Sequence, residues 1–352
     1  MKKLAFVGCG GIANYHLGNM LGYRDFLEKN DISFAGFCDI KLDRAENMVS
    51  RTGCGKAYED FRVMYDEVKP DMVFICIPPY CHGEVDRETF TRGIPAYVEK
   101  PVTLDLDFGE EMLSIIRKNN VITAVGLQCR YGNITDITRQ FCADHQIVYV
   151  DLLRMGGIPD TPWWKKKELS GGQIVEQTIH NYDLVRYALG ADPVEVCTFG
   201  ARGFVRGVED YDTDDLSTTI VRFENGVLGT FSTGDYAQGP ACCEHKTTFS
   251  ARDCHLDHYL LSKVVIYEKK PVEEAAGVVK GDGMIRTTVE GRTIKNECDA
   301  GAMAEQTFFN AVLTGDDTKI RSPYVDGMRS VAFTVACNES MVSGKVVKVR
   351  KF

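Results

Sequence analysis

The sequence of 352 residues has no long basic run, no long apolar run and no CxxC motif. Its formal net charge of −9 argues against nucleic acid or an anionic membrane as the main partner. No segment approaches the roughly 18 apolar residues of a membrane-spanning helix. The apolar run at residues 4–7 is also shorter than the core of a signal peptide, about 7–15 residues. We therefore expect it to be a buried strand.

The thirteen cysteines are scattered along the chain. This pattern is typical of reduced thiols used as small core residues, and it predicts a cytoplasmic protein. Residues 242–258 contain three cysteines and three histidines, which raises the question of a metal. The segment has no CxxC-like pair, and on the strand we expect there, neighbouring side chains point to opposite faces. We therefore predict no metal site.

The length of the chain favours about two domains. Up to about residue 126, short apolar runs alternate with amphipathic stretches, which is typical of a parallel sheet covered by helices on both faces. Beyond that point strands and turns dominate, including a hairpin with an Asn-Gly turn at residues 216–234. We predict an α/β protein with a Rossmann dinucleotide-binding domain over residues 1–125. A substrate-binding and oligomerisation α/β domain would cover residues 126–352, its C-terminal helix being a candidate to pack back on the first domain.

A glycine-rich motif follows the first predicted strand and opens a helix. Glycines at these positions allow a tight turn and let backbone N–H groups approach a pyrophosphate at the helix N-terminus. The residues predicted to bind the cofactor here are Gly8, Gly10, Gly11, Ile12 and Ala13.

The second predicted strand ends at Asp39. A carboxylate there accepts hydrogen bonds from the adenosine ribose hydroxyls and repels a 2′-phosphate, which favours NAD over NADP. The positive charges of Lys41 and Arg44 soften that preference.

Two further loops follow strands, at the sheet edge where such folds bind ligands. One carries Ile77, Pro78 and His82, and the other carries Glu99 and Lys100. A lysine at the mouth of a dinucleotide site can stabilise an alkoxide or transfer a proton, although a solvated loop lysine is the equally simple interpretation.

Residues 171–190 read as one helix that is apolar around most of its circumference. At about 100° per residue, its polar side chains Glu176, His180 and Asp183 fall in one narrow stripe, together with Tyr187. Such a stripe on a buried helix predicts a site at which an acid and an imidazole meet a ligand.

The only tryptophans, Trp163 and Trp164, stand in a loop just before this helix. Large aromatic rings beside polar groups suit stacking on the apolar face of a sugar. We expect at least one of them to contact substrate; the alternative is a loop anchored on the core.

Several motifs in one order make the chain resemble the Gfo/Idh/MocA oxidoreductase family. They are GCGGIA at residues 8–13, CIPPYCH at 76–82, EKP at 99–101, GLQCRYG at 126–132, the helix at 171–190 and the closing stretch after residue 331. The resemblance implies a Rossmann domain followed by a domain with a large, mostly antiparallel sheet that is often used for dimerisation. The chain would then be a homodimer or homotetramer.

The resemblance also assigns roles to residues. It implies that Lys100 and His180 are catalytic, together with Glu176 where many relatives carry Asp. The motif at 126–132 places Gln128 beside the cofactor and Arg130 and Tyr131 beside the substrate.

The activity that this implies is NAD-dependent oxidation of a secondary alcohol on a sugar, glycoside or cyclitol, including oxidation of a glycoside at C3. His180 or Lys100 would be the base, and a coupled pair can share the proton. Two alternatives use the same fold. One is a glycosidase that works through a transient keto-sugar with NAD kept bound, and the other is a non-enzymatic NAD or sugar sensor.

Overall fold

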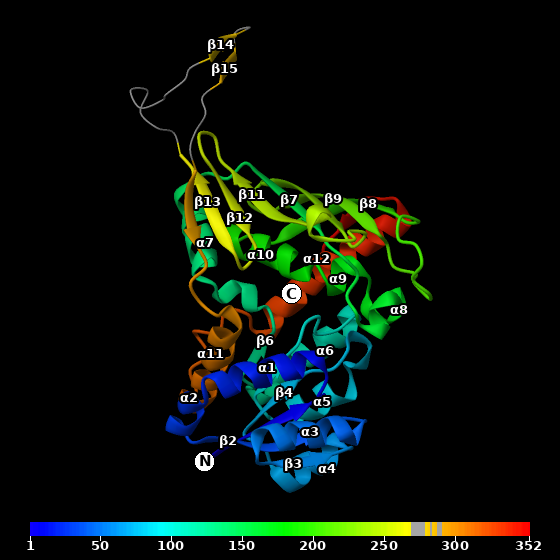
Figure 1. Ribbon diagram of the computed structural model, residues 1–352, viewed down its shortest axis with the longest axis vertical. Helices are drawn as coiled ribbons and strands as arrows, with labels where there is room; N and C mark the ends of the chain where they lie inside the picture. Colours follow the sequence, from blue (N-terminus) through cyan, green and yellow to red (C-terminus); the bar gives the residue numbers. More distant parts are fainter. Residues whose placement is uncertain (269–278, 282–283, 287–290) are drawn as a thin grey trace.

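The computed structural model describes residues 1–268, 279–281, 284–286 and 291–352. Two sheets divide the described chain into two domains, one above the other in Figure 1. The first has six strands in the order β3-β2-β1-β4-β5-β6, and every pairing is parallel. This order, with its reversal beside β1, is that of a Rossmann fold and confirms the predicted fold class of the first part of the chain. Its strands are β1 (Lys2–Val7), β2 (Ile32–Cys38), β3 (Lys56–Tyr58), β4 (Met72–Ile75), β5 (Ala96–Val98) and β6 (Thr123–Val125).

Helices cover both faces of the parallel sheet, because its strands are apolar on both sides. The amphipathic stretches that alternate with the apolar runs in the sequence form these helices. The helices of this part of the chain are α1 (Gly11–Gly22), α2 (Arg24–Lys29), α3 (Leu42–Thr52), α4 (Phe61–Val68), α5 (Glu84–Thr91) and α6 (Leu106–Asn119), with short 3-10 turns η1 (Pro79–Cys81) and η2 (Gln128–Tyr131).

The second sheet has nine strands in the order β16-β13-β12-β11-β7-β10-β9-β8-β17. All its pairings are antiparallel except that of β7 with β10, so the mostly antiparallel sheet is confirmed. The predicted hairpin is formed by β9 and β10. The strands are β7 (Tyr149–Met155), β8 (Pro193–Ala201), β9 (Leu216–Phe223), β10 (Leu228–Gly234), β11 (Glu244–Ser250), β12 (His255–Tyr259), β13 (Lys263–Tyr267), β16 (Arg292–Lys295) and β17 (Val347–Lys348), and β14 (Val279–Gly281) pairs with β15 (Met284–Arg286) separately.

Helices pack on one face of the nine-stranded sheet and bury its inward-pointing side chains, such as Val150, Val221 and Phe231. On the opposite face Phe199, Ile220 and Leu228 are exposed. The helices of this domain are α7 (Asn133–Asp144), α8 (Lys167–Ser170), α9 (Gln173–Glu176), α10 (Ile179–Leu189), α11 (Ala300–Thr314) and α12 (Tyr324–Ser343), with 3-10 turns η3 (Pro162–Lys165) and η4 (Pro240–Cys242).

Two late helices tie the domains together. Helix α11 places Phe308 and Phe309 in the core beside β1 and α1 of the Rossmann domain. Helix α12 divides its apolar side chains: Met328 and Val331 pack with the first domain, and Phe333 packs under the second sheet. The junction between the domains is therefore built from buried apolar surface, which stabilises one relative placement.

The prediction of a single helix over residues 171–190 is wrong. Helix α9 ends at Glu176 and α10 begins at Ile179. At the break the Thr178 N–H bonds to the carbonyl of Gln173, five residues back, and the Thr178 hydroxyl bonds to the same carbonyl at 3.2 Å. A threonine hydroxyl competes with the helical hydrogen-bond pattern in this way. Glu176 and His180 therefore sit on different helices.

Within the described residues no helix is both long enough and apolar enough to span a bilayer. All thirteen cysteines lie in the described ranges, and each is a free thiol.

Candidate functional site

The glycine-rich turn has the geometry of a dinucleotide cradle. Gly8 has φ +87°, and a Cβ at this position would stand 2.2 Å from the carbonyl oxygen of Cys76 on the neighbouring strand end, so only glycine fits. Gly10 and Gly11 face open space at the start of α1, and Gly10, the N-cap, has no side chain to block the first N–H groups of the helix. A helix N-terminus left open in this way suits a pyrophosphate.

Asp39 lies at the end of β2, but it is largely buried and already holds the cradle. Its Oδ2 accepts from the N–H of Cys9 at 2.8 Å, and its Oδ1 accepts from the N–H of Lys41 at 2.9 Å. The Arg44 guanidinium lies 4.0 Å from Oδ2. Each carboxylate oxygen keeps further accepting capacity, so its bond to a ribose hydroxyl stays a prediction.

Two side chains predicted to face the cofactor have polar atoms that the protein does not use. Nδ1 of His82 forms a hydrogen bond with the carboxylate of Asp86 at 3.0 Å. The buried Nε2 of the same ring has no partner among the described residues. The buried Oε1 of Gln128 is in the same condition. Buried polar atoms without partners are costly, and a bound ligand that supplies partners would offset that cost. These atoms and the glycine cradle fit a dinucleotide, with Ile77 and Pro78 half-buried between them.

Lys100 joins the two domains at the candidate reaction centre. Its Nζ donates to the side-chain Oε1 and to the backbone oxygen of Glu176, each at 2.9 Å. Lys100 comes from the loop after β5 and Glu176 from the end of α9. The side chains are 15% and 11% exposed, so a small solvent-facing part of the pair is open to a ligand.

His180 stands beside this pair in the first turn of α10. Burial, reinforced by the positive charge of Lys100, lowers the pKa of its imidazole to about 3. The ring is therefore neutral at physiological pH. Its buried Nδ1 has no partner within the described chain. The structure thus brings together the three residues predicted to be catalytic, in spite of the helix break.

Glu99, the neighbour of Lys100, turns the other way. Its Oε1 lies 2.9 Å from His16 Nε2, and His16 Nδ1 lies 2.7 Å from Oε1 of Glu305 on α11. Burial would lower the pKa of His16, but the hydrogen bonds to Glu305 and Glu99 outweigh it and raise the pKa to about 9. The protein itself contacts both Glu99 oxygens, since Oε2 accepts from the N–H of Lys100 at 3.2 Å, so a cofactor contact by Glu99 stays a prediction.

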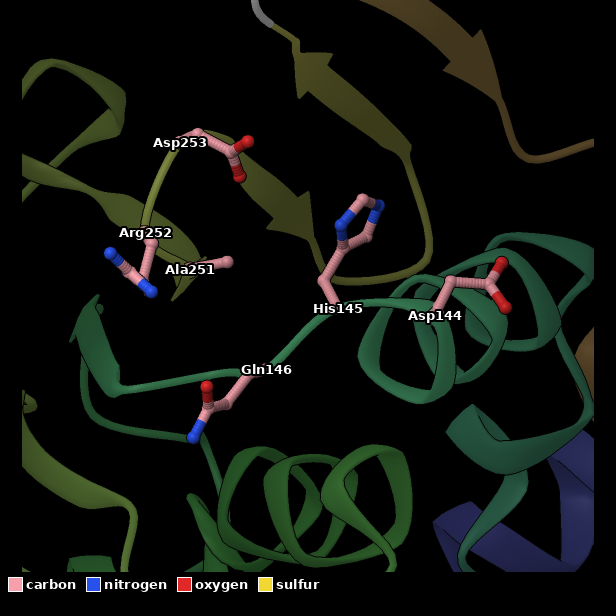
Figure 2. A pocket seen from close by; sticks show the side chains of 6 residues that line it. All are labelled: Asp144, His145, Gln146, Ala251, Arg252 and Asp253. Atoms are coloured by element: carbon pink, nitrogen blue, oxygen red, sulfur yellow. The ribbon is translucent and has the colours of Figure 1, made fainter.

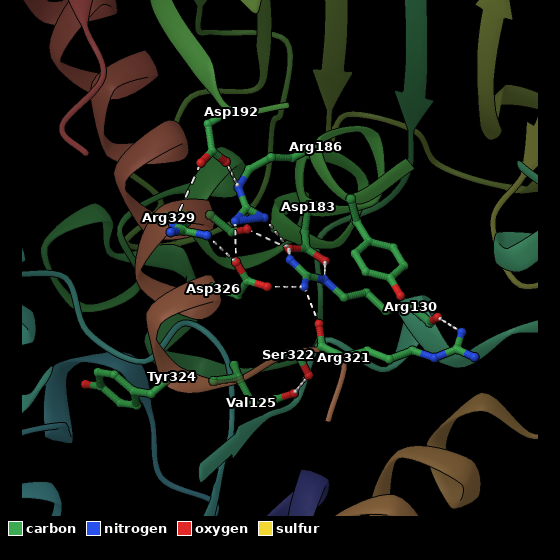
Figure 3. A network of polar contacts seen from close by, with 12 residues as sticks. Val125, Arg130, Asp183, Arg186, Asp192, Arg321, Ser322, Tyr324, Asp326 and Arg329 are labelled. Atoms are coloured by element: carbon green, nitrogen blue, oxygen red, sulfur yellow. Dashed lines mark hydrogen bonds and ion pairs between the residues drawn. The ribbon is translucent and has the colours of Figure 1, made fainter. Parts of the chain in front are cut away.

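Arg130 and Tyr131 were predicted to bind substrate, and this assignment is wrong. Arg130 is fully buried and forms a bidentate ion pair with Asp183 at 2.8 and 2.6 Å, and it contacts Asp326 at 2.7 Å (Figure 3). Tyr131 is buried with its hydroxyl accepting from the Arg321 N–H. Arginine is usually exposed, so nothing local in the sequence indicates that its charge is neutralised inside the fold.

Asp183 belongs to the same buried network rather than to the reaction centre. Besides Arg130, it accepts from the hydroxyl of Ser330 on α12 at 2.6 Å. Arg186, one turn along α10, donates a hydrogen bond to Asp326 at 2.7 Å and forms an ion pair with Asp192 at 2.7 Å (Figure 3). This cluster locks α10 against α12, so Asp183 supports the helix on which His180 stands.

The two tryptophans have different environments. Trp164 is wholly buried and stacks on Tyr211 with ring centroids 6.3 Å apart, while its buried Nε1 has no partner among the described residues, so its contact with substrate stays a prediction. Trp163 is half-buried in η3, and its contact with substrate stays a prediction.

Sequence reasoning missed three residues that extend the site. With its amide oriented to satisfy both neighbours, Gln177 donates to Oε2 of Glu176 and accepts from Nη2 of Arg154, both at 3.2 Å. Arg154 is buried on β7 and forms an ion pair with Asp235, just beyond β10. Side chains alternate between the two faces along β7, which places Arg154 on the inward face. A charged residue at an inward-pointing position was the sequence signal that could have identified it.

A cavity of about 330 Å³ lies at the edge of the second domain and is drawn in Figure 2; it is lined by Asp144, His145, Gln146, Ala251, Arg252 and Asp253. At this edge the ligand atoms of His145, Asp253 and Cys254 lie within 4.8 Å of one another. These residues come from the α7–β7 connection and the β11–β12 turn, so the expected single strand at 242–258 is a hairpin.

Comparison with known proteins agrees with this architecture. A family model described as an oxidoreductase family with an NAD-binding Rossmann fold matches residues 2–127, and the GFO/IDH/MocA C-terminal domain matches residues 131–251. The scyllo-inositol 2-dehydrogenase (NAD(+)) of Bacillus subtilis is 27% identical over 231 residues, covering 64% of this chain and 65% of that protein. The D-glucoside 3-dehydrogenase of Escherichia coli is 25% identical, covering 55% of each chain.

These matches span less than two thirds of the length of either relative. Over the whole chain, the crystal structure of an NAD binding oxidoreductase from Klebsiella pneumoniae superposes with a TM-score of 0.83 at 17% identity, covering 100% of both chains, which shows a shared fold. Because the two matched models belong to one family and follow each other along most of the sequence, the chain belongs to the Gfo/Idh/MocA oxidoreductase family.

Proposed function

We propose that this protein is an NAD-dependent oxidoreductase that moves a hydride between nicotinamide and a secondary alcohol of a sugar, glycoside or cyclitol. The observation that carries the proposal is the Lys100–Glu176 contact beside His180, at the junction between a dinucleotide cradle and the second domain. NAD, when bound, supplies the hydride acceptor for the oxidation. Gly8, Gly10 and Gly11 would hold its pyrophosphate.

Lys100 supplies positive charge to the reacting oxygen. An ammonium group has three N–H donors, and Glu176 accepts two of them, through its carboxylate and its backbone oxygen. The third donor is left for the substrate hydroxyl. A fixed cation there stabilises the alkoxide as the hydroxyl loses its proton.

His180 accepts that proton. Its ring is neutral at working pH, so a ring nitrogen is free to act as the base. The same burial and the same lysine charge disfavour the imidazolium, so His180 would pass the proton on to water at the solvent-facing part of the site.

Glu176 acts through Lys100 as a positioning residue. It fixes the ammonium at 2.9 Å while its second oxygen bonds to Gln177. A glutamate reaches one methylene further than the aspartate of many relatives, and its backbone oxygen shares the same ammonium.

The test is to screen sugars, inositols and glycosides for NADH formation, with wild type and with Lys100→Ala and His180→Ala. Each variant should lose about 10²–10⁴-fold in turnover and still bind NADH, measured by fluorescence. Lys118→Ala, which removes an exposed lysine on α6, is the matched control and should keep full turnover. Near-normal turnover in either site variant would contradict the assignment of Lys100 and His180 as catalytic residues. Aglycone release without net NADH would identify the glycosidase alternative.

We also propose that the protein is a homo-oligomer and cytoplasmic. The open face of the nine-stranded sheet exposes Phe199, Ile220 and Leu228 on three adjacent strands, which suits a second copy of the chain. Thirteen free thiols suit a reducing compartment. Light scattering should give a multiple of 39.3 kDa for the wild type and a smaller mass for Ile220→Lys.

A further inference from the structure

We propose that the site has a second compartment, which binds a second, uncharged, hydroxyl-bearing ring of the substrate. This rests on the proposed function and narrows it to glycosides with two rings. The compartment is a cavity of about 160 Å³ in the second domain, lined by Ile158, Val205, Arg206, Val208, Asp235, Tyr236, Ala237 and Gln238.

A continuous line of polar contacts joins this cavity to the reaction centre. Lys100 bonds to Glu176 and Glu176 to Gln177. Gln177 in turn contacts the guanidinium of Arg154, and Arg154 pairs with Asp235, which lines the cavity. Four side-chain contacts therefore connect Lys100 to the wall of the cavity.

The sheet topology explains why the cavity lies there. Strands β7 and β10 form the one parallel pair among the described strands of this sheet, with Gly234 opposite Met155. Both strands end at the same edge. The residues that follow them, Ile158 from one and Asp235 from the other, meet at that edge and line the cavity.

Asp235 marks the cavity as a binding site. Its side chain is 1% exposed, and while Oδ1 pairs with Arg154, the buried Oδ2 has no partner among the described residues. A buried carboxylate oxygen without a donor is costly. A hydroxyl from a ligand in the cavity would supply the donor.

The size and the walls of the cavity fit one ring. Cavities of about 150 Å³ hold a benzene-sized molecule, and this one measures about 160 Å³. Ile158, Val205 and Val208 provide apolar wall, which suits the C–H faces of a sugar ring.

The charges favour a neutral ring over a nucleotide diphosphate. The guanidinium of Arg154 is already used by Asp235, by the backbone oxygen of Gly234 at 3.0 Å and by Gln177. The remaining cation that lines the cavity, Arg206, is exposed to solvent. A phosphate in the cavity would lie beside the carboxylate of Asp235, which repels it. Burial raises the pKa of Asp235 to about 6, and the negative charge of the nearby Glu176 contributes to this increase.

The experiment compares one-ring and two-ring ligands by calorimetry in the presence of NADH, using methyl glucosides, cellobiose, maltose and trehalose. At least one disaccharide should bind roughly tenfold more tightly than its methyl glucoside, and Val208→Phe, which fills the cavity, should abolish that gain. The affinity for the methyl glucoside should stay within about twofold, because the reaction centre is untouched. Val205→Phe is the second variant if Val208→Phe does not fold, and Val63→Phe on the exposed face of α4 is the matched control.

The outcomes separate the two proposals. Equal affinity for one-ring and two-ring ligands, or a gain that survives both cavity variants, overturns the second compartment. Tighter binding of UDP-glucose than of any disaccharide, lost in Val208→Phe, also overturns it in favour of a nucleotide. A disaccharide gain without NADH formation from any sugar would leave the compartment standing while the oxidoreductase proposal fails.

Discussion

Glu99 and Lys100 are adjacent in the chain, yet they face two histidine environments of opposite character. Glu99 contacts His16, which bridges to Glu305 and has its pKa raised to about 9. Lys100 lies beside His180, whose pKa is lowered to about 3. Burial lowers the pKa of both rings. The ring with two carboxylate partners is charged, and the ring with a cationic neighbour is neutral.

The difference separates a structural histidine from a chemical one. His16 lies on α1, and its two ring nitrogens form hydrogen bonds to the loop after β5 and to α11. These bonds fix the glycine cradle relative to the second domain. The Nδ1 of His180 has no partner within the described residues and remains available. His16 and its two carboxylate partners satisfy one another and stabilise the fold, whereas the unsatisfied Nδ1 of His180 beside Lys100 marks the candidate site.

The largest effect should come from breaking the His16 cluster. His16→Leu would leave Glu99 and Glu305 buried without their shared cation, which costs about 3–5 kcal/mol of unfolding free energy. Urea unfolding of the cofactor-free protein measures this. The control is His245→Leu, in which an exposed histidine on β11 is replaced and little change is expected. Equal stability of the two variants would show that the buried cluster contributes nothing.

A smaller effect should appear as opposite pH slopes. His16 binds its proton more tightly in the folded state, so its contribution is complete below pH 6.5 and is lost as the pH rises toward about 9. His180 and His258 have their pKa lowered to about 3, so the unfolded state binds their protons more tightly. Their contribution to the unfolding free energy is therefore complete above pH 6.5 and is lost as the pH falls. Each proton changes the unfolding free energy by about 1.4 kcal/mol per pH unit.

Stability should therefore be greatest near pH 6.5, measured by urea unfolding between pH 5 and 9. His16→Leu should flatten the alkaline side, and His180→Asn should flatten part of the acid side. An alkaline slope that is unchanged in His16→Leu contradicts the charged state assigned to this residue.

The smallest effect should come from Glu176→Asp. The shorter side chain draws the carboxylate away from Lys100, but the backbone oxygen at 2.9 Å still holds the ammonium. We expect turnover to fall by about tenfold or less, since one of two charge-assisted contacts is lost. Steady-state kinetics measures it, with Glu176→Gln as the control that keeps the length and removes the charge. A larger loss in the aspartate variant than in the glutamine variant would show that reach matters more than charge.

Much of the site was predictable because it follows local rules. The glycines need a tight turn at the end of a strand, and the residues after parallel strands meet at one edge of the sheet. These rules lead directly to the cradle and to Lys100. The pairing of Lys100 with Glu176 and His180 was available only through resemblance to the family, since they come from different domains.

The rest depended on distant contacts. From the sequence, Arg130 is interpreted as a surface or substrate-binding residue. In the structure it contacts Asp183, 53 positions away, and Asp326, 196 positions away. The helix over 171–190 has continuous helical periodicity, yet the Thr178 hydroxyl bonds to the Gln173 carbonyl and breaks it. No periodicity records such a competing bond.

The sequence by itself determined the order of strands and helices, the glycine cradle and the presence of a lysine, an acid and an imidazole in family positions. Hydrophobic spacing and backbone sterics are short-range properties, so they can be read along the chain. Only the tertiary structure decided which charges are buried together. It sends Glu99 to a charged histidine and Lys100 to a neutral one, because burial and the charges of distant residues set each protonation state.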